Sequence, residues 1–419
     1  MNILLKSATI FDKNSKFHKQ TKDVLIQNNT FTQIADSIDC PNDCEEISLE
    51  NLQISNGWFD SSVSFGEPGY EERENLSNGL DTAAKSGFTE VAVNSNTNPY
   101  LDTKASIAYL KNLSALKATN LYPIASLTRN SKGVEMAELY DMKAAGAVAF
   151  GDYNKAIEND NLMKVALQYA QNFDGLVLSF PLNNAIGGEG IAHEGLNSTL
   201  LGLKGIPGLA EEMQITRDIS LLEYTGGKLH IPTVSSKKSV ELIREAKKKN
   251  LKVTCSVTTH HLTLTDVELK GFNGNTKVLP PLRAEEDRLA LIEGVKDGTI
   301  DCITSDHNPI DIENKKVEFN NAEFGTIGLE NLFGSLQTVL ETETIIDALT
   351  TGPKAVFGID QETIEEGKPA NISLFTDKKE TTFALKDILS TSKNSIFLDK
   401  TVKGKAYGIY AKGQLVLNK

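Results

Sequence analysis

The sequence predicts an α/β protein whose main part is a (β/α)8 TIM barrel, joined to a small β domain built from both termini. Two observations carry this prediction. Over about 300 residues in the middle of the chain, short apolar runs alternate with segments of helical apolar spacing. Both ends of the chain instead show short strand-like runs separated by polar turns. We assign residues 1–55 and 356–419 to the β domain and residues 56–355 to the barrel.

The terminal segments are predicted as strands because they combine β-branched residues, partial alternation and Asn, Asp or Gly breaks. The expected strands lie within residues 2–12, 23–35, 45–56, 370–377, 406–413 and 414–419. Since neither end supplies a complete sheet, we expect the two ends to meet in one small domain.

The middle of the chain contains repeated strand–helix units. The first apolar run that predicts a strand is QISNGWFD. Further runs of this kind lie at residues 88–94, 121–127, 147–152, 175–180, 228–234, 252–258 and 301–306. Helical spacing, followed by Gly or Asn before the next strand, marks residues 76–87, 102–117, 131–146, 162–172, 239–250 and 284–298. Seven or more such units in one run fit a closed barrel better than an open doubly wound sheet.

The composition narrows the possible functions. The chain has 419 residues, of which 40% are hydrophobic and 24% are charged, as in ordinary globular proteins. Its 43 basic and 56 acidic residues give a net charge of −13, which disfavours nucleic acid and anionic membrane surfaces as partners. The N-terminus has no signal-peptide pattern, and no apolar stretch is long enough to cross a bilayer. We expect a cytoplasmic protein with neither a nucleic-acid nor a membrane partner.

The four cysteines are too few for a disulfide framework in a chain of this length. Cys40 and Cys44 lie close together in a polar loop, where oxidation could join them, although a chance pair is the simpler interpretation. Cys255 and Cys302 lie in apolar runs and are predicted to be core residues.

Candidate functional residues follow from the barrel itself, because catalytic side chains of such barrels lie at the carboxyl ends of the strands. The polar or histidine residues at these ends are Asp60, Ser62, Ser64, Asn96, Asp152, Ser179, His230, Thr233, His260, His261, Asp306 and His307.

Several motifs in this order resemble the dihydroorotase branch of the amidohydrolase superfamily. They are GWFDSSVSFGEPG, NTNP, THHL, FGTIGLE and, most densely, PPLRAEEDRLALIEGVKDGTIDCITSDHNP. The resemblance implies a barrel with a small β domain built from both termini, as predicted above. It also implies zinc chemistry, in which a metal-bound water attacks a cyclic amide and a final Asp accepts its proton.

The chain departs from the family pattern at most of the implied metal ligands. The resemblance places ligands at Ser62, Ser64, Asp152, Ser179, Thr233 and Asp306. Four of these are Ser or Thr where the family has His, and hydroxyls are weak zinc donors. We therefore expect no intact metal site and no zinc cofactor, with Asp306 left as a vestigial catalytic residue.

The substrate side of the pattern is also incomplete. By the resemblance, the Arg that clamps the substrate carboxylate is replaced by Gly66, and an Asn by Leu279. Asn96 is retained and is predicted to be a vestigial substrate-binding residue. Losing a bidentate Arg contact removes the strongest kind of carboxylate recognition.

Three hypotheses follow. The preferred one is a catalytically silent dihydroorotase homologue that acts as a structural or regulatory partner of aspartate transcarbamoylase, as silent homologues of the family can, and that forms a homodimer. The second is an active cyclic amidohydrolase with a metal site rebuilt from His260, His261, Asp152 and Asp306. The third is a small-molecule sensor that uses Asn96.

The other histidines are predicted to be structural. His18 is expected at the surface, His193 in a Gly-rich loop that lacks a phosphate-binding pattern, and His230 in the core with hydrogen bonds. His307 is expected to point away from Asp306, because neighbouring strand residues alternate in direction. A hydrolase built on Ser62 and a histidine has no supporting nucleophile motif.

Overall fold

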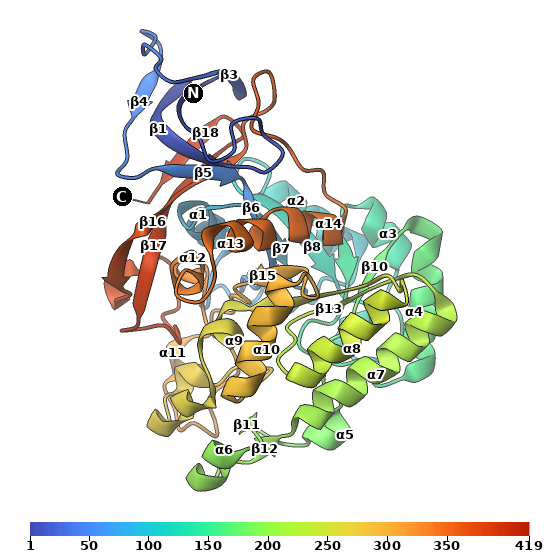
Figure 1. Cartoon of the computed structure of the whole chain (residues 1–419). Coiled ribbons are helices and arrows are strands. Elements are labelled where there is room, and N and C mark those ends of the chain that lie inside the picture. The colour runs from blue at the N-terminus through green and yellow to red at the C-terminus, as the bar shows by residue number, and fades with distance from the viewer. Residues whose placement is uncertain (419) are drawn as a thin grey trace.

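The computed structural model describes residues 1–418 and shows the predicted barrel with its added terminal sheet, so the fold class is confirmed (Figure 1). Eight parallel strands form the barrel in the order β15-β14-β13-β10-β9-β8-β7-β6. Their bounds are β6 Trp58–Val63, β7 Phe88–Val93, β8 Asn120–Ala125, β9 Ala149–Phe150, β10 Leu176–Leu178, β13 Lys228–Ile231, β14 Val253–Thr258 and β15 Cys302–Thr304.

The barrel closes where β15 meets β6. The backbone N–H of Ser64 donates to the carbonyl oxygen of His307 at 2.6 Å, just beyond the ends of both strands. The buried Asp60 reinforces this seam, because its Oδ2 accepts a hydrogen bond from the Ser305 N–H at 3.1 Å and its carboxylate also accepts from the Thr304 hydroxyl. This carboxylate therefore holds the first and last strands together.

Helices cover the outside of the barrel, and four of them begin at a side chain that caps the first turn. Asn75, Thr103, Asn159 and Ser236 each accept a hydrogen bond from an N–H in the first turn of the helix that follows. These helices belong to the set α1 Leu76–Lys85, α2 Lys104–Leu113, α3 Leu139–Ala144, α4 Asp160–Ala170, α7 Gly208–Thr225, α8 Lys237–Lys248, α10 Glu285–Lys296, α12 Leu332–Leu336, α13 Thr342–Leu349 and α14 Thr351–Phe357.

Shorter elements lie in the connections. They are α5 Asn184–Gly187, β11 Ala192–His193, α6 Leu196–Leu201, β12 Gly205–Ile206, α9 Thr259–Thr263, α11 Ile312–Lys315 and the 3-10 turns η1 Arg129–Ser131, η2 Gln171–Phe173, η3 Asp266–Gly271, η4 Gly274–Thr276 and η5 Leu385–Asp387.

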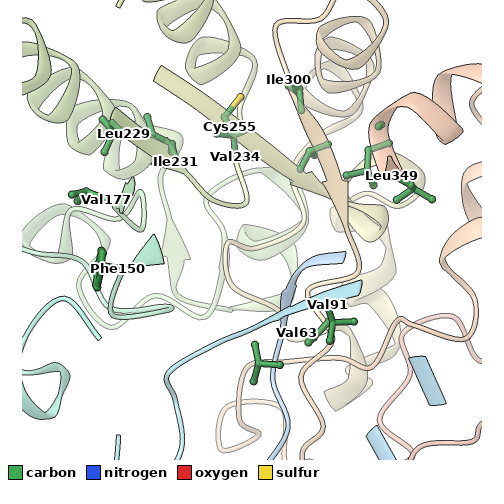
Figure 2. Packing of buried hydrophobic residues seen from close by; sticks show 14 of the residues in the cluster. Val63, Val91, Phe150, Val177, Leu229, Ile231, Val234, Cys255, Ile300 and Leu349 are labelled. Carbon is green, nitrogen blue, oxygen red and sulfur yellow. The ribbon is translucent and has the colours of Figure 1, made fainter. Parts of the chain in front are cut away.

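The main core lies between the barrel strands and the helices (Figure 2). Val63, Val91, Val177 and Leu229 are fully buried in it, as is Cys255, which confirms the prediction that this cysteine is a core residue. Strand residues of the opposite parity turn into the barrel, where Phe59, Ala92, Ile124, Ala149, Leu176 and Leu178 form a smaller inner cluster with Phe357 of α14.

The terminal sheet has eight strands, drawn from both ends of the chain. They are β1 Ile3–Phe11, β2 Thr21–Gln27, β3 Thr30–Ala35, β4 Glu45–Ile47, β5 Gln53–Asn56, β16 Ile372–Thr382, β17 Thr401–Ala411 and β18 Gln414–Leu417. The two ends join where β5 pairs antiparallel with β16. The exact division at residues 55 and 356 stays a prediction.

Two local expectations were wrong. The helix predicted over residues 131–146 is reduced to α3, and Gly133, with φ near +69°, lies in the non-helical segment before it. Residues 187–195, expected as a Gly-rich loop, include the two-residue strand β11, which pairs with β12 in a short ribbon. Within residues 1–418, no helix combines the length and apolar character that a membrane span requires.

Trp58 joins the barrel to the terminal sheet. Its ring is fully buried, stacks on Phe333 at 4.9 Å between centroids and packs on Phe375 of β16 at 5.4 Å. Its Nε1–H donates to Ser55 Oγ at 2.9 Å. One side chain thus connects the first barrel strand, the helical layer and the sheet.

We predict that Trp58→Ala lowers the free energy of unfolding by about 3–5 kcal/mol, because it removes a fully buried ring between two layers. Urea denaturation measures this change. Leu116→Ala is the control, since this leucine is 90% exposed and its truncation is expected to change stability by less than about 0.5 kcal/mol. A Trp58→Ala loss no larger than the control would contradict this role.

Candidate functional site: the mouth of the barrel

Four side chains meet by hydrogen bonds at the carboxyl ends of the strands. Ser62 Oγ donates to Asp306 Oδ1 at 3.0 Å, and the Tyr153 hydroxyl donates to the same oxygen at 3.3 Å. Asn94 Nδ2 donates to Ser62 Oγ at 3.1 Å. We call Ser62, Asn94, Tyr153 and Asp306 the mouth network. It connects β6, β7, β9 and β15 at the place where the resemblance implies a metal.

The network continues to two other residues expected in the site. Asn94 Nδ2 also lies 3.2 Å from Ser64 Oγ, and Ser64 Oγ donates to Asn96 Oδ1 at 3.0 Å. The structure therefore brings together four of the predicted site residues, namely Ser62, Ser64, Asn96 and Asp306. Their polar atoms bond to one another.

Burial controls the protonation of the network. It raises the pKa of Asp306 to about 7, although the hydrogen bonds from Ser62 and Tyr153 favour the ionised form. Burial also raises the pKa of Tyr153 well above its ordinary value, so its hydroxyl remains a neutral donor. The neighbouring Asp60 has its pKa raised to about 6, again chiefly by burial. Burial thus favours the neutral, protonated forms of Asp306, Tyr153 and Asp60.

Two predicted ligand positions point away from the network. Asp152 Oδ1 accepts from the Thr128 N–H at 3.0 Å, and its Oδ2 accepts from the Thr128 hydroxyl. Ser179 Oγ donates to Asp218 Oδ2 of α7 at 2.6 Å. Asp152 and Ser179 therefore bond to residues outside the mouth network.

A small cavity of about 20 Å³ lies beside the mouth network, which is enough for about one water molecule. Thr233 lines it, and the Thr233 hydroxyl has no hydrogen-bond partner among the described residues. Phe180 and Leu279 also line it, and they fill the space between the polar groups with apolar surface. Small-molecule sites usually measure about 300–1,000 Å³, so this cavity is far below that range.

The backbone at the mouth is strained. Tyr153, Thr233 and Asp306 have φ values of 53°, 56° and 46°, in the left-handed region that side chains with a Cβ rarely adopt. Such strain costs about 1–3 kcal/mol per residue and concentrates at functional sites. Three strand ends at the mouth therefore carry residues in this strained conformation.

The histidines near the barrel have structural partners. His230 bonds to Thr254 Oγ1 at 2.9 Å and to Ser256 Oγ at 3.3 Å, and burial lowers its pKa to about 3, so the prediction of a hydrogen-bonded core histidine is confirmed. His261 bonds to Thr258 Oγ1 at 2.7 Å and to the Pro280 carbonyl oxygen at 3.1 Å.

The two remaining histidines near the strand ends are also buried. His307 Nδ1 accepts a hydrogen bond from the Gly328 N–H at 3.2 Å, away from Asp306. His260 is 1% exposed, and neither of its ring nitrogens has a hydrogen-bond partner within residues 1–418.

The residues present do not fit zinc. A zinc site needs about four nitrogen, sulfur or carboxylate donors in tetrahedral arrangement. At the mouth, the implied positions offer the hydroxyls of Ser62, Ser64 and Thr233 and one carboxylate, Asp306, which already accepts two hydrogen bonds. Among residues 1–418, no group of three or more His, Cys, Asp and Glu side chains is arranged to hold a metal ion.

Three site residues were not identified from the sequence. Asn94 was overlooked in favour of Asn96, although the two-residue period of β7 places it on the inward face with Ala92. Tyr153 directly follows the predicted ligand Asp152, and its contact with Asp306 joins residues 153 positions apart. Asp218 lies on a helix and gave no local signal, because its contact with Ser179 joins residues 39 positions apart.

Comparison with protein families gives one match within this region. The family model described as dihydro-orotase-like matches residues 53–239. A protein named dihydroorotase from Geotalea daltonii is 36% identical over 422 residues, covering 99% of each chain. The dihydroorotase of Pelotomaculum thermopropionicum is 38% identical over 423 residues, covering 100% of this chain and 99% of its own.

Solved structures show the same fold at lower sequence identity. The L-hydantoinase (dihydropyrimidinase) of Arthrobacter aurescens superposes with a TM-score of 0.86 at 20% identity, covering 100% of this chain and 96% of its own. The dihydropyrimidinase of Brevibacillus agri gives a TM-score of 0.82 at 18% identity, covering 100% and 95%. At this level of identity the likeness concerns the fold alone.

We predict that Asp306→Asn gains stability relative to the wild type as the pH rises from 4 to 8. The folded wild type holds the Asp306 proton more tightly than the unfolded chain, because the pKa is about 7 instead of 3.8. The protonated Asp306 therefore stabilises the folded state fully below pH 4. This contribution to the free energy of unfolding is lost as the pH rises through 7, and the total loss is up to about 4 kcal/mol. Denaturant titrations at several pH values measure the difference.

Asp174→Asn is the control, because Asp174 is exposed and its hydrogen bond with Lys228 lowers its pKa. A difference between Asp306→Asn and the wild type that is constant from pH 4 to 8 would contradict a buried, proton-binding Asp306.

Proposed function

Because the chain belongs to the dihydroorotase family, we propose that it retains the family scaffold without the zinc-dependent reaction. Its role would be that of a structural or regulatory partner of aspartate transcarbamoylase in cytoplasmic pyrimidine biosynthesis. The observation that carries this proposal is the mouth network, in which the hydroxyls of Ser62 and Tyr153 donate to Asp306, and the Asn94 amide donates to Ser62, where the family places a metal. A homodimer is proposed on the same family analogy.

The surroundings of Asp306, the residue that would act as the base, support this proposal. A carboxylate at the last strand end acts as a base only if an activated water lies within hydrogen-bond distance. Asp306 Oδ1 instead accepts from Ser62 and Tyr153, and burial raises the pKa of Asp306 to about 7. It serves as a hydrogen-bond acceptor that holds strand ends together.

The two positions where the resemblance implies substrate-binding side chains, Gly66 and Leu279, give independent support. At Gly66, where the resemblance places a carboxylate-binding Arg, a Cβ atom would lie 1.9 Å from the Tyr70 carbonyl oxygen. The backbone therefore leaves no room for any side chain at this position. Leu279, which replaces an Asn, lines the small cavity with apolar surface. Neither position can bind an anionic pyrimidine in this arrangement.

An active dihydroorotase is the second candidate, and the names of the relatives at 36–38% identity favour it. It requires a metal site rebuilt from His260, His261, Asp152 and Asp306. In the structure His261 bonds to Thr258, and Asp152 bonds to Thr128, so these groups do not converge on Asp306. A large rearrangement of the mouth would be needed for catalysis.

A sensor that binds a small molecule is less well supported. Asn96, the anchor named for it, already accepts a hydrogen bond from Ser64, and the adjoining cavity of about 20 Å³ is too small for a pyrimidine. Such a function would need the mouth to open.

We predict that the purified protein neither opens dihydroorotate nor closes carbamoyl aspartate above the background rate, even with excess zinc. The physical reason is that the mouth holds no ligand set and no room for substrate. An ultraviolet assay measures both directions, and the Geotalea daltonii relative is the positive control. Turnover that Asp306→Ala abolishes would establish the second candidate instead.

We also predict that the protein co-elutes with aspartate transcarbamoylase of the same organism in size-exclusion chromatography. At micromolar concentrations a specific complex should shift both proteins to a larger common mass, since stable interfaces give free energies of about −8 kcal/mol or better. Separate elution of the two proteins over a range of salt concentrations would refute the partnership.

A further inference from the structure

The segment 184–206 forms an arm that leaves the barrel after β10 and returns at α7, at the end of the molecule opposite the terminal sheet (Figure 1). Its helix α6 presents Leu196, which is 74% exposed, and Leu200, which is 73% exposed. These two leucines are four residues apart and therefore lie on one face of the helix. Exposed leucines this close together are a common mark of an interaction surface.

The two leucines are not needed to hold the arm in place. Leu201 and Leu203, elsewhere on the arm, pack against the buried Leu269 and Phe319. Val267, on the turn η3 that contacts α6, is also 49% exposed. The arm thus has one apolar side inside the protein and a second one left uncovered.

A buried network fixes the position of the arm. Arg283 is 3% exposed, and its Nη1 donates to the Ile206 carbonyl oxygen at 2.8 Å and to His193 Nδ1 at 3.1 Å. Its guanidinium lies 3.6 Å from the buried carboxylate of Glu211, which also accepts from the Ser235 N–H at 2.8 Å. A surface held in this way loses little conformational entropy when it binds, which favours affinity.

The exposed charges on the arm and on the elements that adjoin it are mainly acidic. Exposed or half-buried acids on the arm and near the N-termini of α7 and α10 are Glu189, Glu194, Glu212, Glu285, Glu286 and Asp287. Glu189 and Glu285 have ion-pair partners, Lys204 and Arg288, but Glu194, Glu212 and Glu286 have none within residues 1–418. This rim repels a second copy of a chain whose net charge is −13 and attracts a basic surface.

We infer that Leu196 and Leu200 form a docking surface for a protein partner that presents an apolar groove bordered by Lys and Arg. This inference rests on the proposed function, in which the candidate partner is the transcarbamoylase. The leucines would form the buried centre of the interface. The acidic residues would orient the partner by attracting its Lys and Arg side chains.

The test compares two variants in complex formation with the purified transcarbamoylase. In Leu196→Glu/Leu200→Glu, charges replace the apolar centre, and the dissociation constant measured by calorimetry should rise at least about tenfold. Leu116→Glu is the matched control, because it makes the same change at a leucine that is 90% exposed elsewhere, and its affinity should equal that of the wild type. Equal melting temperatures of all three proteins would show that the fold is unchanged.

The outcomes separate the two proposals. If the wild type binds and the double variant binds equally well, the docking surface is wrong while the proposed function stands. If the wild type itself fails to bind, both are overturned. If the double variant instead converts a wild-type dimer into monomers and leaves transcarbamoylase binding unchanged, the surface belongs to a second copy and the inferred partner is wrong.

Discussion

The hydrogen bonds that converge on Asp306 are the interaction on which the barrel mouth depends. They join the ends of β6 and β15 through Ser62 and reach β9 through Tyr153, while Asp60 closes the seam beneath them through Ser305. A carboxylate in a dry site is costly unless its oxygens are bonded or protonated. Here both conditions act together, because burial raises the pKa of Asp306 to about 7 and neutral donors surround it. Side-chain and backbone hydrogen bonds therefore link the strand ends.

The mouth combines unusual backbone conformations with side chains that are weak metal ligands. The backbone keeps the left-handed conformations at Tyr153, Thr233 and Asp306 that are typical of catalytic strand ends. The side chains placed by that backbone are hydroxyls, a phenol and one carboxylic acid, which bind metal poorly. At Gly66, where the resemblance implies a substrate-binding Arg, the Tyr70 carbonyl oxygen lies too close for any side chain to fit. Sequence similarity over the whole chain thus reports the fold, while activity depends on a few positions.

Much of the fold could be predicted from the sequence, because each barrel strand is an apolar run and several helices begin at capping residues such as Asn75 and Ser236. The resemblance also assigns candidate site positions near the strand ends, but the directions of their side chains could not be predicted. Asp152 points to Thr128 instead of the mouth because side-chain direction beyond a strand end depends on loop conformation, as the positive φ of Tyr153 shows. The arm was missed because its helices are short and its anchor, Arg283, is distant in sequence.

The central claim is that the mouth of this barrel cannot hold a metal ion. Its most direct test is the zinc content of the protein after equilibration with excess zinc and gel filtration, measured by mass spectrometry alongside the Geotalea daltonii relative. The account predicts that Asp306→Ala leaves the zinc content of this protein unchanged. One zinc ion per chain that disappears in Asp306→Ala would contradict the account, because it would mean that the residues here described as structural rearrange into a metal site.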